Sequence, residues 1–236
     1  TVPQVYKIFG PGNQYVTCAK QLVNKGGVAI DMPAGPSEVA VLADETCVPA
    51  FVAADLLSQA EHGPDSQVVL VTTSEKVIAE VEQALQVQLD RLPRRSIATE
   101  ALNNSKMILV DNLDTAMDML NAYAPEHLIL ACKNELNIAD KVTNAGSVFL
   151  GNYTPESAGD YASGTNHTLP TNGYARAYSG VSLDSFVKKI TFQQITPQGL
   201  QNIGTTIEAM AAAEGLEAHK NAVTVRLESL DISTDK

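Results

Sequence analysis

The sequence has 236 residues, 44% of them hydrophobic and 18% charged, which is enough for one large or two small domains with a buried core. Sixteen basic residues against 27 acidic ones give a formal net charge of −11, and no stripe of lysine and arginine is present, so we expect no nucleic-acid partner. Long apolar runs are absent, and Cys18, Cys47 and Cys132 lack metal-binding spacing, so we expect no membrane partner and a reducing cytoplasmic location.

Strands and helices alternate along the first 151 residues. Short apolar runs predict strands at 5–9, 27–31, 39–43, 67–73, 107–111, 127–132 and 147–151. Segments of helical periodicity predict helices from 10–13 through residue 20 and at 48–61, 74–92, 97–103, 113–122 and 136–143. The apolar stripe of the helix at 48–61 is expected to hold Phe51, Ala54, Leu56 and Leu57. This alternation predicts an α/β fold of Rossmann-like three-layer sandwich elements with mostly parallel sheets.

The character of the chain changes after Gly151. About 30 residues rich in Gly, Ser, Thr, Asn and Pro follow, and loops of that length are uncommon unless they are functional or disordered, so we expect an ordered functional loop. From residue 183 we expect a helix, a short strand at 190–196 and two further helices, which form a small C-terminal helical appendage. The expected parts are an α/β domain (1–120), part of a second α/β domain (121–182) and a mainly helical segment (183–236).

The stretch QAEHG ends the helix expected at 48–61. Gln59 and His62 are three residues apart and project from one helical face, so both can reach a single ion. The same spacing also fits a solvated helix end at which a histidine interacts with the helix dipole.

Other metal-ligand candidates lie far along the chain. Asp160 and His167 belong to the long polar loop, and His219 follows Glu214 in the C-terminal segment. Each also has an ordinary explanation in turn chemistry or on a helix surface. A side-chain amide is an unusual zinc ligand, so these residue types leave the metal open.

Acid–base and ligand-binding candidates lie at loops beside strands. Glu126 and His127 are adjacent where a helix gives way to a strand, and they would supply two bases of different intrinsic pKa, unless they form only a polar turn. Asn13 ends the loop GPGN and Ser37 lies in MPAGPSE, two loops that follow expected strands, where open α/β sheets bind ligands. A tight turn explains either loop equally well.

The order of these motifs resembles the histidinol dehydrogenase family. The resemblance covers nearly the whole chain, from KIFGPGN to the last helix, and it rests on long strings that occur in order: AIDMPAGPSEV, DLLSQAEHGPDSQV, NAYAPEHLIL, GNYTPESAGDYASGTNHTLPT and EGLEAHKNAV. It implies NAD-linked oxidation of L-histidinol to L-histidine through L-histidinal, the last steps of histidine biosynthesis.

The resemblance also implies a role for each matching residue. One zinc ion per site would be held by Gln59, His62, Asp160 and His219. His127 would be the general base for hydride transfer, and Glu126 would activate the water that adds to the aldehyde. The substrate contacts would be these four zinc ligands with Ser37, His127 and Glu214, and the cofactor contact would be Asn13. No role is carried over to His167.

Members of the family are longer and work as homodimers. The resemblance therefore implies that this chain corresponds to the C-terminal portion of such a protein and has reduced or no activity alone. It also implies that the segment 183–236 serves dimerisation, with His219 and Glu214 completing the site of the other copy. Two other readings of the same residues are a metal-dependent hydrolase or lyase and a non-catalytic metal- or ligand-binding module.

Overall fold

The computed structural model describes residues 3–234, with side chains described up to residue 230. The chain divides into two compact units, Thr1–Val187 and Lys188–Lys236. The first unit holds helices and parallel strands and the second holds helices, so the α/β fold with mostly parallel sheets and a helical C-terminal part is confirmed. Within the described residues, no helix is both long and apolar enough to cross a membrane.

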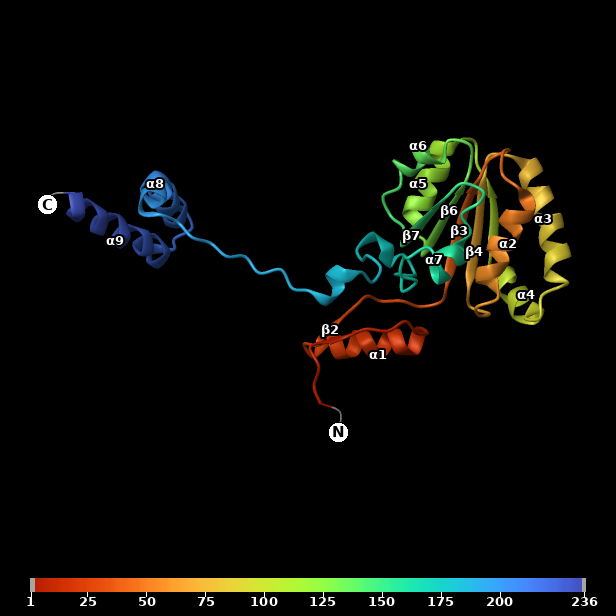
Figure 1. Ribbon diagram of the computed structural model, residues 1–236, viewed down its shortest axis with the longest axis horizontal. Coiled ribbons are helices and arrows are strands. Elements are labelled where there is room, and N and C mark those ends of the chain that lie inside the picture. Colours follow the sequence, from red (N-terminus) through yellow and green to blue (C-terminus); the bar gives the residue numbers. More distant parts are fainter. Residues whose placement is uncertain (1–2, 235–236) are drawn as a thin grey trace. The chain divides into compact units, whose positions relative to one another are not determined.

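A five-stranded parallel sheet is the centre of the first unit (Figure 1). Its strands run in the order β5-β4-β3-β6-β7 and are β3 (Glu38–Ala43), β4 (Gln67–Thr72), β5 (Lys106–Leu109), β6 (His127–Ala131) and β7 (Ser147–Leu150). Because β3 pairs with both β4 and β6, residues on both sides of the boundary expected at 120 share one sheet. The segment 121–182 therefore does not form a separate sheet.

Helices cover both faces of this sheet (Figure 1). One face carries α2 (Pro49–Ala60), α3 (Glu75–Leu89) and α4 (Arg95–Asn103), and the other carries α5 (Leu113–Tyr123) and α6 (Glu135–Ala139). Alternate residues of β3 enter the two cores: Val39 and Val41 pack with the first group, and Ala40 and Leu42 with the second. Because both faces of β3 are buried, its sequence is apolar at nearly every position.

The buried face of α2 differs from the expected stripe. Leu56 and Leu57 are buried as predicted, but Phe51 and Ala54 are exposed. The helix presents Val52, Ala53 and Ala60 to the core instead. This helix is apolar on more than one side, and the sheet beneath it selects which side is covered.

A smaller parallel sheet precedes the large one. β1 (Lys7–Ile8) and β2 (Ala29–Ile30) form it, and α1 (Gln14–Lys25) connects them. A buried ion pair between Lys20 and Asp31 joins the helix to the end of β2. Lys20 Nζ also donates to the Gly10 carbonyl oxygen over 2.8 Å, which holds the GPGN loop against the helix.

The long polar segment after β7 is ordered, as predicted, and it also contains short helical elements. It contains α7 (Glu156–Tyr161) and a 3₁₀ turn, η1 (Tyr174–Arg176), and a second turn, η2 (Leu183–Phe186), follows it. The second unit contains α8 (Pro197–Ala213) and α9 (Glu217–Thr234). The strand expected at 190–196 is wrong, because no β-structure forms there. Its alternating sequence has no neighbouring strand with which to pair.

Candidate active site

A polar cavity of about 330 Å³ lies between the two sheets of the first unit. Its walls come from the loops at the carboxyl ends of β1 and β2 and from the amino ends of β3 and β6. The predicted site residues of this unit all line it: Asn13, Ser37, Gln59, His62, Glu126, His127 and Asp160. His167, for which no role was expected, lines it as well. Glu214 and His219 belong to the second unit, so their part in the site stays a prediction.

Three helices deliver the remaining side chains of the wall. Gln59 lies in the last turn of α2 and His62 two residues past its end, because Gly63 and Pro64 stop the helix there. Asp160 lies on the short helix α7. Asn13 caps α1, and its side-chain oxygen accepts the backbone N–H groups of Tyr15 and Val16.

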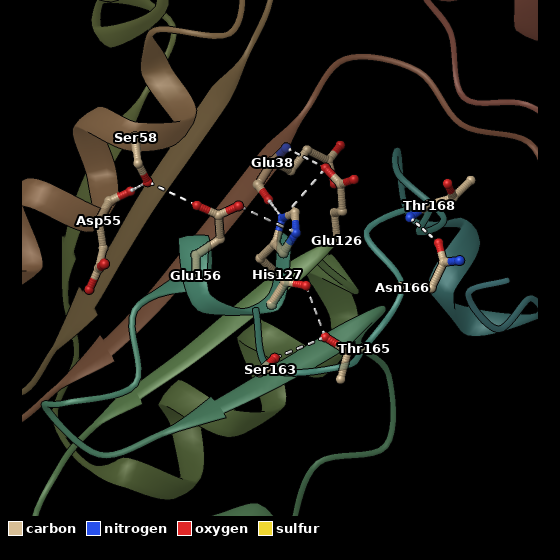
Figure 2. Close-up of polar contacts among 11 residues, drawn as sticks. Glu38, Asp55, Ser58, Glu126, His127, Glu156, Ser163, Thr165, Asn166 and Thr168 are labelled. Carbon is tan, nitrogen blue, oxygen red and sulfur yellow. Dashed lines mark hydrogen bonds and ion pairs between the residues drawn. The ribbon is translucent and has the colours of Figure 1, made fainter. Parts of the chain in front are cut away.

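His127 is the first residue of β6 and is held between β3 and β7. Its Nδ1 lies 3.0 Å from the carbonyl oxygen of Glu38 (Figure 2). A carbonyl group only accepts hydrogen bonds, so Nδ1 carries the hydrogen and Nε2 is left with its lone pair. Among the described residues Nε2 has no hydrogen-bond partner. Burial lowers the pKa of His127, against the hydrogen bond to Glu38 and the charge of Asp160. The ring is therefore a neutral base at pH 7.

Glu126 is buried beside the imidazole (Figure 2). Its Oε2 accepts the backbone N–H of Glu38 over 3.0 Å and lies 3.6 Å from Nδ1 of His127. Burial raises the pKa of Glu126 well above its ordinary value, and the charges of Glu38, Asp160 and Glu156 add to this, while the hydrogen bond from Glu38 opposes it. A carboxyl group with a raised pKa is suited to exchange protons near neutral pH.

Two further buried acids complete the site, and the sequence analysis did not single them out. Glu156 is 1% exposed, its Oε2 lies 3.1 Å from Ser58 Oγ, and its Oε1 lies 3.8 Å from His127 Nε2. Burial raises its pKa to about 8, with a further contribution from Asp160. Glu38 is the first residue of β3 and is also buried. Its place directly before the run VAVLA was the one available signal, whereas an acid in a first helical turn, as Glu156 is, is too common to be one.

The donor atoms around the cavity fit a divalent metal ion. Gln59 Oε1 is buried and has no hydrogen-bond partner among the described residues, an arrangement that costs free energy unless a cation or a ligand satisfies the atom. Ligand atoms of His127, Glu156 and Asp160 lie within 4.8 Å of one another. Imidazole, carboxylate and amide donors on one cavity are suitable ligands for a metal of the zinc type. Whether the ion takes the predicted set with His62 stays a prediction.

A neutral imidazole with a free lone pair beside a carboxyl group of raised pKa, on one polar cavity, is typical of enzyme active sites. Fold and site together define an α/β protein with a candidate acid–base site. The family model for histidinol dehydrogenase matches residues 1–227. The chain belongs to the histidinol dehydrogenase family.

Its relatives show how much of such a protein the chain spans. It is 70% identical over 230 residues to the histidinol dehydrogenase of Bacteroides thetaiotaomicron and 56% identical over 233 residues to that of Yersinia pestis. These matches cover 98% of this chain and 54% and 53% of the relatives. The crystal structure of histidinol dehydrogenase from Elizabethkingia anophelis matches with a TM-score of 0.94 and 64% identity, over 98% of this chain and 53% of that one. The chain thus spans about half the length of these relatives.

Proposed function

We propose that the protein containing this chain oxidises L-histidinol to L-histidine through L-histidinal, with NAD as electron acceptor and one zinc ion per site. The observation that carries this proposal is the free lone pair of His127 Nε2 beside Glu126 on a polar cavity, in a chain of the histidinol dehydrogenase family. The cavity volume of about 330 Å³ is suited to a small amino alcohol.

His127 is the base of the first oxidation. A hydride can leave the carbinol carbon only if the hydroxyl proton goes to a nearby acceptor, and the neutral Nε2 is such an acceptor. The Glu38 carbonyl holds the opposite ring nitrogen, so the ring keeps one tautomer throughout. NAD, when bound, supplies the hydride acceptor, and Asn13 is the proposed contact to it.

Glu126 serves the second oxidation. Its carboxylate takes a proton from the water that adds to the aldehyde carbon, and this gives the hydrate from which the second hydride leaves. The raised pKa makes the carboxylate a stronger base than an ordinary glutamate. Ser37, on the same wall, is a proposed substrate contact.

Gln59, His62 and Asp160, with His219, are the proposed zinc ligands, and zinc, when bound, would orient the amino and imidazole groups of the substrate. The proposed assembly is a homodimer in which the partner's His219 and the partner's Glu214 complete each site. The proposed location is the cytoplasm, since Cys18, Cys47 and Cys132 are all free thiols.

The test follows NADH formation from L-histidinol, then from L-histidinal, with the natural full-length protein that contains these residues. His127→Asn should lower the first rate by about 10²- to 10⁴-fold. Glu126→Gln should leave the rate of the first hydride transfer unchanged and lower the rate of the second, so that the aldehyde accumulates. Glu100→Gln, an exposed change on α4, is the control. Bound zinc without any NADH formation by the wild type would overturn the proposal. The same assay on the 236 residues alone tests the expectation that they are weakly active.

A further inference from the structure

Glu38 contacts both members of the catalytic pair through its main chain. Its N–H donates to Glu126 Oε2 over 3.0 Å, and its carbonyl oxygen lies 3.0 Å from His127 Nδ1 (Figure 2). One residue at the start of the central strand therefore sets the orientation of the acid and the tautomer of the base.

The side chain of Glu38 reaches a different part of the wall. Its Oε1 accepts the backbone N–H of Asn172 over 2.8 Å, across 134 residues of sequence. Asn172 has a left-handed backbone (φ 54°), and the preceding Thr171 is buried and accepts the N–H of Gly35 through its hydroxyl oxygen. Since Thr171 and Leu169 line the cavity, the Glu38 carboxyl group anchors one of its walls.

We propose that Glu38 is a positioning residue of this site: its carboxyl group holds the wall around Asn172, and its main chain orients Glu126 and His127. The kinetic consequences of this inference rest on the proposed function. Its structural basis, the contacts of Glu38, is independent of that function. Nothing in the proposed reaction requires Glu38 to touch the substrate.

The two carboxyl oxygens of Glu38 have different surroundings. Oε2 is buried and has no hydrogen-bond partner among the described residues, whereas Oε1 accepts the Asn172 N–H, so Oε1 is the atom that holds the wall. A neutral amide at this position would offer the same acceptor to the Asn172 N–H.

Two substitutions separate the roles of the carboxyl group. Glu38→Gln keeps the shape and an acceptor for Asn172 and removes only the charge. Glu38→Ala removes the acceptor as well, and leaves the Asn172 N–H without its partner. Glu45→Gln, at an exposed position beyond the other end of β3, is the matched control.

The kinetic experiment measures KM and kcat for L-histidinol in the natural full-length protein with zinc and NAD. For Glu38→Ala, KM should rise about tenfold with kcat nearly unchanged, which corresponds to one lost buried hydrogen bond, and Glu38→Gln should keep the wild-type KM. An unchanged KM in Glu38→Ala, or an equal rise of KM in Glu38→Gln, with or without a loss of thermal stability, would overturn the proposal.

A second measurement needs no catalysis. Hydrogen exchange followed by NMR reports the protection of the Asn172 N–H, which Glu38 Oε1 accepts. Exchange should be about tenfold faster in Glu38→Ala and unchanged in Glu38→Gln and Glu45→Gln. Unchanged exchange in Glu38→Ala would refute the inference. If the wild type forms no NADH but Glu38→Ala shows the faster exchange, only the proposed function is refuted.

Discussion

Replacing Gln59 by leucine should change stability in opposite directions with and without metal. Gln59 is 1% exposed, and its Oε1 has no hydrogen-bond partner among the described residues. Without metal, that buried oxygen costs about 1–3 kcal/mol, and leucine, of similar volume, removes the cost. Imperfect packing of the new side chain lowers the free energy of unfolding by about 1 kcal/mol. The metal-free variant should therefore be more stable by about 1 kcal/mol, or about 2–4 °C in Tm for a unit of this size.

Zinc should reverse the order. A ligand at 100 times its Kd stabilises the folded state by about 2.7 kcal/mol, and a site that has lost one ligand atom gains much less of this. The variant should then be less stable than the wild type by about 1–2 kcal/mol. The order reverses because the same oxygen destabilises the fold when it is unpaired and stabilises the fold when it binds the ion.

The assay is thermal and urea unfolding by circular dichroism, in chelator and in excess zinc. Gln86→Leu on α3 is the control, because Gln86 is exposed and its side chain bonds Asp90, which caps the same helix. This control should change stability by less than about 0.5 kcal/mol in either condition. A difference between Gln59→Leu and wild type of the same sign in chelator and in zinc would refute the reasoning.

Three other changes test the packing, the electrostatics and the proposed assembly. In Gly146→Ala the new Cβ would lie 2.5 Å from the Glu126 carbonyl oxygen, which the β6–β7 pairing holds in place, so urea unfolding should show a loss of about 1–3 kcal/mol. Burial raises the pKa of Asp55 from 3.8 to about 6, so the fold binds this proton more tightly than the unfolded chain does, and the wild type loses stability as pH rises from 3.8 through about 6. Asp55→Asn escapes that loss, and urea unfolding should show it to be more stable by about 2 kcal/mol above pH ~7 and equal below pH ~4. Mixing His62→Ala with His219→Ala subunits should restore zinc binding in about a quarter of the sites if the partner subunit completes each one, and no restoration in metal analysis would contradict the shared site.

Much of the fold could be predicted because its strands are continuous apolar runs. Both faces of β3 and β6 are covered, so VAVLA and HLILA can be recognised without any knowledge of their neighbours. The segment 190–196 alternates like a strand, but a strand also needs a neighbour to accept its hydrogen bonds, and sequence does not supply that information. The exposed Phe51 of α2 was mispredicted for the same kind of reason, because the sheet decides which side of an apolar helix is buried.

The site was predictable where polar residues interrupt an apolar pattern. Gln59 and His62 lie around the end of a helix, and Glu126 and His127 lie where a strand begins, so their side chains stand out. Glu38 and Glu156 do not, because their importance comes from burial against segments far away in the chain. Glu156 meets Ser58 across 98 residues, and Glu38 meets Asn172 across 134. A local sequence pattern cannot indicate a contact between residues so far apart in the chain.

The position of the cavity gives its wall two electrically different parts. Ligands of open α/β sheets usually bind at the carboxyl ends of the strands, and the small sheet follows this rule, whereas the large sheet offers the amino ends of β3 and β6. Helix α2 runs back from the carboxyl edge of β3, so it ends at the cavity, and the negative end of its dipole lies where Gln59 and His62 are placed. The carboxyl groups of Glu126 and Asp160 line the same cavity.

Another part of the wall is the start of α1, at the Asn13 cap. The Asn13 side chain accepts the N–H groups of Tyr15 and Val16, so it is the positive end of the α1 dipole that favours anions there. One cavity thus combines a part of its wall suited to a metal ion with a part suited to an anion. That polarity follows from the directions in which two helices run, and the proposed reaction of an amino alcohol with a dinucleotide would use it.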